Sequence, residues 1–198
     1  MDRTLSYYNE NSKDFALQTQ TLDFSSTAEC FLALIPPDSL ILDFGCGAGR
    51  DTKYFLNRGY RVNAVDGSEE LCALASEFTG IEVKQMLFQD LCSQEEYDGI
   101  WACASVLHLQ IADLEDVFAK MLKALKPNGI LYVSFKYGVF EGYRNGRWFT
   151  DFTEEKFDVF KQQFPDLTIE NQWTSRDIRQ GRGEEIWLNL LIRKIVSL

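Results

Sequence analysis

Five short segments with strand character, separated by segments with helical spacing, organise the first two thirds of the chain. They cover residues 40–44, 60–66, 81–86, 97–103 and 130–135. The first and the last are continuous apolar runs, which are typical of strands that helices cover on both faces. The intervening sequence predicts helices over 26–35 and 51–58, from Glu69 onward and from Asp113 to Leu125. This alternation of strand and helix predicts a doubly wound, mostly parallel α/β sheet.

The segment that begins at Asp113 has the most regular helical pattern. Its apolar residues recur on one face, and they are Leu114, Val117, Phe118, Met121, Leu122 and Leu125. Asp113 is placed to cap its start, and Lys126-Pro127-Asn128-Gly129 is placed to stop it.

The two ends of the chain have weaker patterns. Residues 136–150 look irregular, a helix is expected over 153–164, and two final strands over 167–173 and 186–194 could pair antiparallel at one edge of the sheet. Residues 1–23 are polar with scattered aromatic side chains. They could be a frayed end with a short helix, or a flap whose Tyr and Phe side chains cover a bound ligand.

Three glycines at alternate positions follow the first strand, in the pattern Asp43-x-Gly45-x-Gly47-x-Gly49. Glycine costs conformational entropy, so this density points to a backbone that approaches a ligand closely at the end of a strand. The fingerprint of dinucleotide-binding turns requires a third glycine where this chain has Arg50. A nucleotide-dependent oxidoreductase is therefore disfavoured.

Two acidic residues follow later strands. Asp66 lies 21 positions after Gly45, at the end of the second strand, where an acid that holds a ribose is expected. The alternative is an Asp that caps a helix or turn, which the sequence Asp66-Gly67-Ser68 also fits. Asp90 follows the third strand, and its alternative is likewise a loop or cap residue.

The order and spacing of these segments over residues 40–135 resemble the class I S-adenosylmethionine-dependent methyltransferases. The continuation Gly49-Arg50-Asp51-Thr52 resembles small members described as tellurite-resistance-related. The resemblance implies a seven-stranded, mostly parallel Rossmann-like sheet with an antiparallel edge hairpin. It also implies S-adenosylmethionine as cofactor, S-adenosylhomocysteine as product, and a single in-line displacement that moves a methyl group to an acceptor.

The resemblance further implies roles for single residues. Asp66 would bind the ribose, Asp90 the adenine amino group, and the backbone of Leu91 the adenine ring. Asp43 would fix the loop or receive the cofactor's ammonium group, and Arg50 would pair with the methionine carboxylate or with a neighbouring acid. The remaining positions implied to contact the cofactor are Tyr8, Gly45, Gly47, Gly49, Gly67 and Ala104.

The sequence says less about the residues that would contact the methyl acceptor. His108, the single histidine, could be a general base or a hydrogen-bond donor to substrate, or a histidine packed at a helix start. Arginine and aromatic side chains beyond the shared core suit a planar or anionic small molecule, although most could be solvated or buried in the core. The candidates chosen for substrate contact are Tyr137, Arg147, Trp148 and Arg179.

The composition of the chain argues against several kinds of binding partner. A formal net charge of −10 argues against nucleic acid as partner, because such binding depends on many Lys and Arg contacts to phosphate. Five cysteines without a Cys-x-x-Cys pair, beside one histidine, argue against a metal site. The sequence shows no leader pattern and no run of about 18 apolar residues, so we expect a cytoplasmic protein with no membrane contact.

We expect one domain over 1–198, made of an amino-terminal flap (1–36), a cofactor-binding core (37–135), and a substrate-side insert with the final strands (136–198). A methyltransferase that acts on a small molecule is the leading interpretation. A methyltransferase for RNA or protein, and a non-catalytic module that binds the cofactor or a partner, remain alternatives.

Overall fold

The structure is a computed structural model that describes residues 3–195. Short 3-10 helices lie at η1 (Phe88–Asp90) and η2 (Val106–His108). The α-helices are α1 (Arg3–Glu10), α2 (Ser12–Thr19), α3 (Ser25–Leu32), α4 (Arg50–Asn57), α5 (Glu69–Thr79), α6 (Ile111–Ala124) and α7 (Glu154–Lys161). The strands are β1 (Leu40–Phe44), β2 (Arg61–Asp66), β3 (Val83–Gln85), β4 (Tyr97–Ala102), β5 (Leu125–Lys136), β6 (Glu141–Arg144), β7 (Arg147–Thr150), β8 (Leu167–Arg176) and β9 (Ile186–Lys194).

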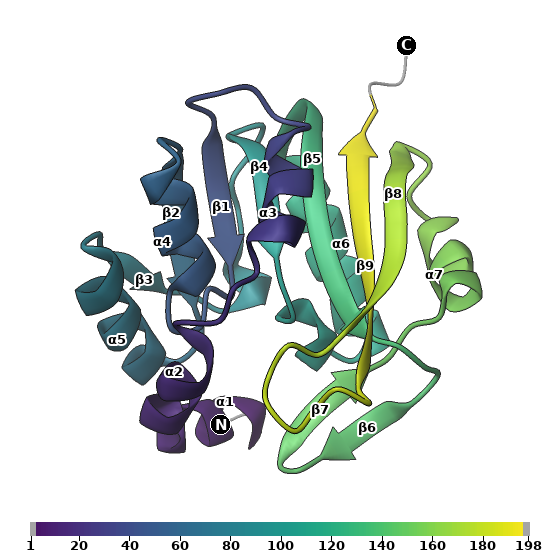
Figure 1. The fold of residues 1–198 in the computed structure, drawn as a ribbon. Helices are drawn as coiled ribbons and strands as arrows, with labels where there is room; N and C mark the ends of the chain where they lie inside the picture. The colour runs from purple at the N-terminus through teal and green to yellow at the C-terminus, as the bar shows by residue number, and fades with distance from the viewer. Residues whose placement is uncertain (1–2, 196–198) are drawn as a thin grey trace.

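Seven of the strands form one twisted sheet, shown in Figure 1, in the order β3-β2-β1-β4-β5-β9-β8. The strands β1 to β5 pair in parallel, whereas β9 runs antiparallel to both β5 and β8. The predicted fold class is confirmed, including the antiparallel pairing of the last two strands.

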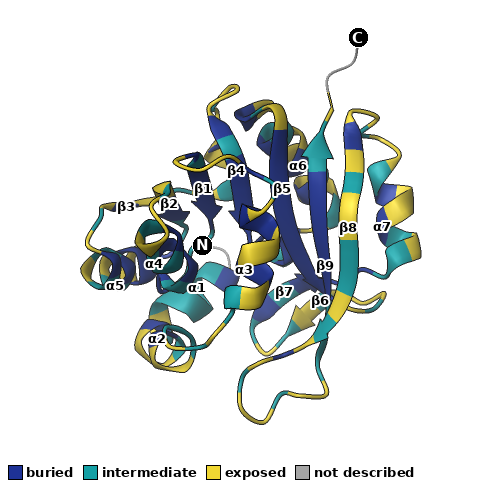
Figure 2. Cartoon of the chain, turned by 45° about the horizontal axis from the view of Figure 1, so that its top comes forward, coloured by how far each residue is buried: buried dark blue, intermediate teal, exposed yellow. Residues whose placement is uncertain are grey.

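Helices cover both faces of this sheet, which explains the continuous apolar runs. Ile41 packs into a cluster with Phe31 of α3 and Phe55 of α4. Leu42, the next residue of β1, packs into the larger cluster that holds the inner faces of α6 and α7. Figure 2 shows the resulting pattern, with buried central strands and exposed outer faces on the helices.

The largest error in the sequence-based assignment is in the segment 136–150, which is not irregular. It contains the two-stranded hairpin β6–β7, whose turn is Asn145-Gly146. Both turn residues have positive φ, 48° for Asn145 and 81° for Gly146. Asn-Gly between two short strands is the commonest signal for such a tight hairpin turn, so the sequence did contain the information.

Several predicted element ends are also wrong. The helix expected over 26–35 ends at Leu32. Asp113 does not cap α6, because Gln110 occupies the cap position and Asp113 lies inside the first turn, where its charge still favours the helix dipole. The segment Lys126 to Gly129 does not separate helix from strand by a loop, since β5 begins directly at Leu125.

The amino-terminal residues form two helices, α1 and α2, at the end of the sheet to which β1 points (Figure 1). Gln20, just after α2, donates from Nε2 to the carbonyl of Ala48 at 2.9 Å and so ties this segment to the glycine turn. Among residues 3–195, no helix has both the length and the apolar character needed to cross a bilayer.

Candidate active site

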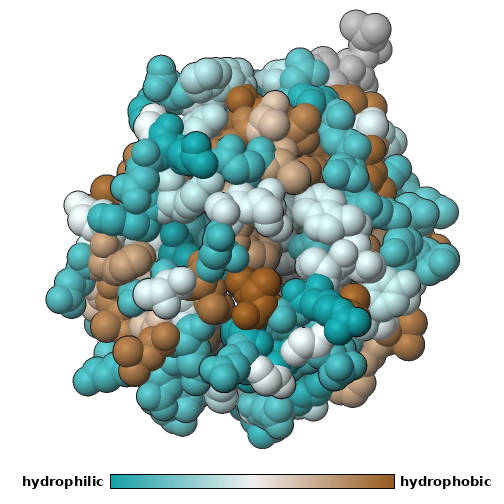
Figure 3. Space-filling view, viewed as in Figure 1, coloured by the Kyte–Doolittle hydropathy of each residue, from teal (hydrophilic) through white to brown (hydrophobic). Residues whose placement is uncertain are grey.

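A cavity of about 810 Å³ opens at the carboxyl ends of the parallel strands. In open α/β sheets this is the edge where ligands bind. The walls of the cavity come from α1 and α2, the glycine turn after β1, the hairpin β6–β7 and the loop between β8 and β9. Figure 3 shows the molecule in the view of Figure 1, and the face turned to the viewer carries mainly hydrophilic side chains, with apolar atoms in groups between them.

The glycine turn has the geometry that its sequence predicts. Gly45 has φ +82° and Gly47 has φ +56°, a region that side chains other than glycine rarely adopt. A Cβ on Gly45 would lie 2.5 Å from Cβ of Ser105, and one on Gly47 would lie 3.0 Å from the ring of Phe15. Both glycines line the cavity. Gly49 lies against Ala75 and Thr79 of α5 instead, so its missing side chain permits helix packing.

Asp66 connects the glycine turn to the end of β2. Its carboxylate accepts hydrogen bonds from the backbone N–H of Gly47 at 2.8 Å and of Ser68 at 2.9 Å. Burial raises the pKa of Asp66, while these amide donors favour the charged form. A carboxylate has about four acceptor positions, so acceptor capacity remains beside these amides for a hydroxyl group of a ligand in the cavity. Asp66 and the adjacent Gly67 both line the cavity.

Asp43 is buried and does not line the cavity. Its Oδ2 accepts a hydrogen bond from the Thr52 hydroxyl at 2.5 Å, which joins the end of β1 to α4. Burial, followed by the nearby charge of Asp51, raises the pKa of Asp43 to about 8. Of the two roles suggested for Asp43, the structure favours fixing the loop.

Replacing Asp43 with asparagine should flatten the dependence of stability on pH. Because the folded-state pKa lies above the unfolded value, the protonated carboxyl stabilises the wild type below pH ~4, and this contribution is lost as pH rises toward 8. The free energy of unfolding of D43N minus that of wild type should therefore increase between pH 5 and pH 8.5. Urea unfolding at the two pH values measures this difference; a difference that stays constant would contradict the assignment.

Arg50 lines the cavity but is already ion-paired. Its guanidinium donates two hydrogen bonds to Asp51, at 2.7 and 2.8 Å, and lies over the ring of Phe24 at 4.7 Å. Asp51 also accepts a bond from the indole of Trp101 at 2.8 Å. Arg50 is thus bonded to a neighbouring acid, which was one of the two arrangements expected for it.

The predicted adenine contacts, Asp90 and Leu91, do not line the main cavity. Asp90 is exposed in η1 and lines an adjoining cavity of about 250 Å³, which shares Gly67, Met86 and Leu87 with the main one. The side chain of Leu91 is buried in the core of the sheet. The cavity wall at this end is instead formed by residues that the sequence analysis missed, namely Met86, Leu87, Phe88 and Gln89. Apolar side chains at a strand end give the same signal as core residues, so the pattern could not identify them.

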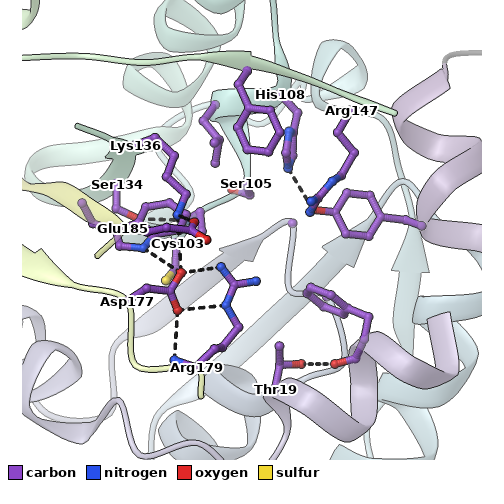
Figure 4. A pocket seen from close by; sticks show the side chains of 18 of the residues that line it. Thr19, Cys103, Ser105, His108, Ser134, Lys136, Arg147, Asp177, Arg179 and Glu185 are labelled. Atoms are coloured by element: carbon purple, nitrogen blue, oxygen red, sulfur yellow. Dashed lines mark hydrogen bonds and ion pairs between the residues drawn. The ribbon is translucent and has the colours of Figure 1, made fainter. Parts of the chain in front are cut away.

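His108 and Arg147, both labelled in Figure 4, meet Tyr8 in the cavity, and the three residues come from three separate elements. The Tyr8 hydroxyl lies 2.9 Å from Nε2 of His108, and Nη1 of Arg147 donates to the same hydroxyl at 3.4 Å. Nδ1 of His108 lies 2.6 Å from the carbonyl oxygen of Trp148. A carbonyl can only accept, so Nδ1 carries the proton and Nε2 of the neutral ring accepts from Tyr8.

Trp148 contributes its backbone to this arrangement, and its side chain does not line the cavity. Its indole donates to the Thr150 hydroxyl at 3.0 Å. Ala104, which was predicted to lie near the cofactor, does line the cavity. Its φ is +51°, and its N–H donates to the Ser134 hydroxyl at 2.9 Å.

A second charged group lies where β5 and the β8–β9 loop meet, and Figure 4 shows it on the opposite wall from His108. Lys136 pairs with Asp177 and Glu185, and its Nζ lies 4.0 Å from the ring centre of Trp187. Arg179 donates to Asp177 through Nε at 2.9 Å. Although burial opposes ionisation, the hydrogen bonds from Arg179 hold the pKa of Asp177 well below its usual range.

Of the predicted substrate residues, Tyr137, Arg147 and Arg179 line the cavity. The sequence analysis included Arg179 but missed its partners Lys136, Asp177 and Glu185. Lys136 is far from the other three in the chain, and the antiparallel pairings of β9 with β5 and with β8 bring all four together.

Comparison with known proteins agrees with this geometry. Residues 41–129 match a family model described as a methyltransferase domain. An uncharacterized methyltransferase of Staphylococcus carnosus is 25% identical over 134 residues, which are 67% of this chain and 60% of that protein. The N-terminal Xaa-Pro-Lys N-methyltransferase 1 of Rattus norvegicus is 32% identical over 103 residues, which are 48% of this chain and 46% of that protein. The matched region thus spans about half the length of these curated relatives.

Solved structures extend the similarity to nearly the whole fold. The 1,6-didemethyltoxoflavin-N1-methyltransferase of Burkholderia thailandensis, solved with 1,6-didemethyltoxoflavin and S-adenosylhomocysteine, superposes with a TM-score of 0.76 at 21% identity, covering 97% of this chain and 87% of that one. A putative methyltransferase of Haloferax volcanii, solved in complex with the Trm112 activator, gives 0.74 at 16% identity, covering 97% and 98%.

The sheet order and the glycine turn define a Rossmann-like domain that binds its ligand at the carboxyl ends of the strands. Together with the family match over residues 41–129, they confirm the predicted resemblance to the class I S-adenosylmethionine-dependent methyltransferases. The cofactor on which this class depends is the predicted one, S-adenosylmethionine. The similarity to tellurite-resistance-related members stays a prediction.

Proposed function

We propose that the chain transfers a methyl group from S-adenosylmethionine to a small-molecule acceptor. The observation that carries the proposal is that one cavity contains both the glycine turn with Asp66 and the group formed by Tyr8, His108 and Arg147. Its volume of about 810 Å³ lies in the upper part of the range for ligand sites, ~300–1,000 Å³. This leaves room for an acceptor beside a cofactor.

The residues present fit the cofactor. Gly45 and Gly47 present backbone without side chains to the cavity, and Asp66 retains acceptor capacity for a ribose. The apolar wall of Met86, Leu87 and Phe88 suits a flat ring, and these residues replace Asp90 and Leu91 in our account of the adenine side. When bound, the cofactor supplies a methyl group on a sulfonium, ready for one in-line displacement.

The chain's own residues bind, align and exclude water. Alignment of two reactants can supply about 7–11 kcal/mol of a barrier. Tyr8 and Phe15, from α1 and α2, cover the cavity and exclude solvent, which is the role proposed for the amino-terminal flap. Nε2 of His108 can take a proton from an acceptor hydroxyl or amine that displaces the Tyr8 hydroxyl from it, and the Trp148 carbonyl holds the ring in the tautomer required.

The chain is proposed to work as one unit, in which the flap (1–36) and the insert with the final strands (136–198) enclose the core (37–135). The five cysteines are unpaired, which favours the reducing cytoplasm as its compartment.

Two alternatives can be separated by experiment. A protein acceptor, as the name of the rat relative states for that enzyme, needs a groove open to a peptide. Here α1, the hairpin β6–β7 and the β8–β9 loop all contribute to the cavity wall, which favours a small acceptor. RNA is disfavoured by the net charge of −10. A non-catalytic module would bind the cofactor without consuming it.

Release of S-adenosylhomocysteine in the presence of a metabolite extract tests the proposal. The fraction of the extract that supports turnover should pass an ultrafiltration membrane with a cut-off of about 1 kDa. Its ability to support turnover should survive treatment with protease and with ribonuclease. Activity that is lost after protease or ribonuclease treatment would assign a macromolecular acceptor. Tight cofactor binding without turnover in any fraction would favour the non-catalytic module.

A further inference from the structure

Arg147 is a buried cation that forms no ion pair with an acid among the residues that the structure describes. It lies on β7 in the wall of the cavity, and only 8% of its surface is exposed. Its Nε–H is buried and has no hydrogen-bond partner within residues 3–195. The one hydrogen bond recorded for the guanidinium joins Nη1 to the Tyr8 hydroxyl at 3.4 Å, which is long.

Other cationic groups of the cavity wall differ from Arg147 in this respect. Arg50, Lys136, Arg144 and Arg179 each form an ion pair with an aspartate or glutamate. Arg147 has no such pair within the described part of the chain. A buried charge normally requires a partner because its removal from water is costly.

Aromatic rings surround the guanidinium instead. Its central carbon lies 4.4 Å from the ring centre of Tyr7, 5.7 Å from that of Tyr8 and 5.3 Å from that of Phe149. Ring faces attract a cation and offset part of the desolvation cost, but they do not satisfy the in-plane N–H donors. The edge that carries Nε–H is the edge with which arginine binds carboxylates through two parallel hydrogen bonds.

We propose that Arg147 binds a carboxylate of the methyl acceptor, so that the substrate class is a small carboxylic acid. This inference rests on the proposed methyltransferase function. The acid would complete the ion pair that Arg147 lacks within residues 3–195, with Tyr8 of α1, which lines the cavity, beside it. It would also place the rest of the acceptor beside Nε2 of His108, which shares the Tyr8 hydroxyl with Arg147.

The test is a pair of isosteric probes, benzoate and benzamide, titrated by calorimetry into protein saturated with S-adenosylhomocysteine. Wild type should bind benzoate at least tenfold more tightly than benzamide. R147M should lose this preference. R147K keeps the positive charge but lacks the two parallel N–H donors of the guanidinium, so it should retain only part of the preference. R176M is the matched control, since Arg176 also lines the cavity but is exposed; its preference should stay within twofold of wild type.

Equal affinities for the two probes in wild type, no benzoate binding at millimolar concentration, or a preference that survives in R147M would overturn the inference. A structural role is excluded by thermal unfolding without ligand, in which R147M should melt close to wild type. A fall in melting temperature above about 5 °C would show that Arg147 instead anchors α1. Binding of S-adenosylhomocysteine in the same samples reports separately on the proposed function.

Discussion

Replacing Asp66 with alanine is expected to weaken the binding of S-adenosylhomocysteine at least tenfold. Two losses act together. The ligand's ribose loses an acceptor, and a hydrogen bond to a charged group contributes ~1.5–3 kcal/mol. The backbone N–H groups of Gly47 and Ser68 also lose the carboxylate that fixes the turn to the end of β2. Isothermal titration calorimetry measures the change.

Two variants control for this effect. D66N keeps the volume but replaces one acceptor oxygen with a donor, which cannot satisfy both backbone amides, so it should also bind weakly. D90A should change the affinity less than twofold, because Asp90 lies outside the main cavity. If D90A lost affinity tenfold while D66A did not, the cofactor would lie nearer to the position that the sequence first suggested for adenine.

Replacing His108 with alanine is expected to lower kcat with the identified acceptor by about 10²-fold or more while leaving cofactor affinity unchanged. A positioned general base typically contributes ~10²–10⁴-fold. The ring is held for this role by two contacts, from Nδ1 to the Trp148 carbonyl and from Nε2 to the Tyr8 hydroxyl. Steady-state kinetics with saturating cofactor measure kcat, and calorimetry measures the affinity.

Tyr8 provides the comparison variant. Y8F keeps the ring that packs against Phe15 and His108 but removes the hydroxyl. Its kcat should fall less than that of H108A, because Nε2 remains available to the acceptor. If H108A retained most of its activity, alignment alone would account for catalysis, and the histidine would be a packing residue of the cavity wall.

The fold was predictable because its strongest signals are local. Continuous apolar runs such as 40–44 exist because helices pack on both faces of β1, where Ile41 and Leu42 enter different clusters. The apolar face of α6 likewise appears in the sequence as apolar residues that recur with the period of a helix. Helix ends were predicted less well, since Gln110 caps α6 through its backbone geometry alone and Asp113, a better cap former, lies one turn too far along.

The site was predictable only where one stretch of chain makes it. Gly45, Gly47 and Asp66 belong to adjacent strand ends, so spacing alone locates them. The contacts among Tyr8, His108 and Arg147 join residues up to 139 positions apart, and no local pattern encodes that distance. The ion pairs of Lys136 with Asp177 and Glu185 depend on strand register in the same way.

A crystal structure of the protein with S-adenosylhomocysteine tests the central claim most directly. The account predicts density in the main cavity, with the methionine part against the backbone of Gly45 and Gly47 and both ribose hydroxyls on the carboxylate of Asp66. Density elsewhere on the molecule, or a ribose that does not contact Asp66, would contradict it.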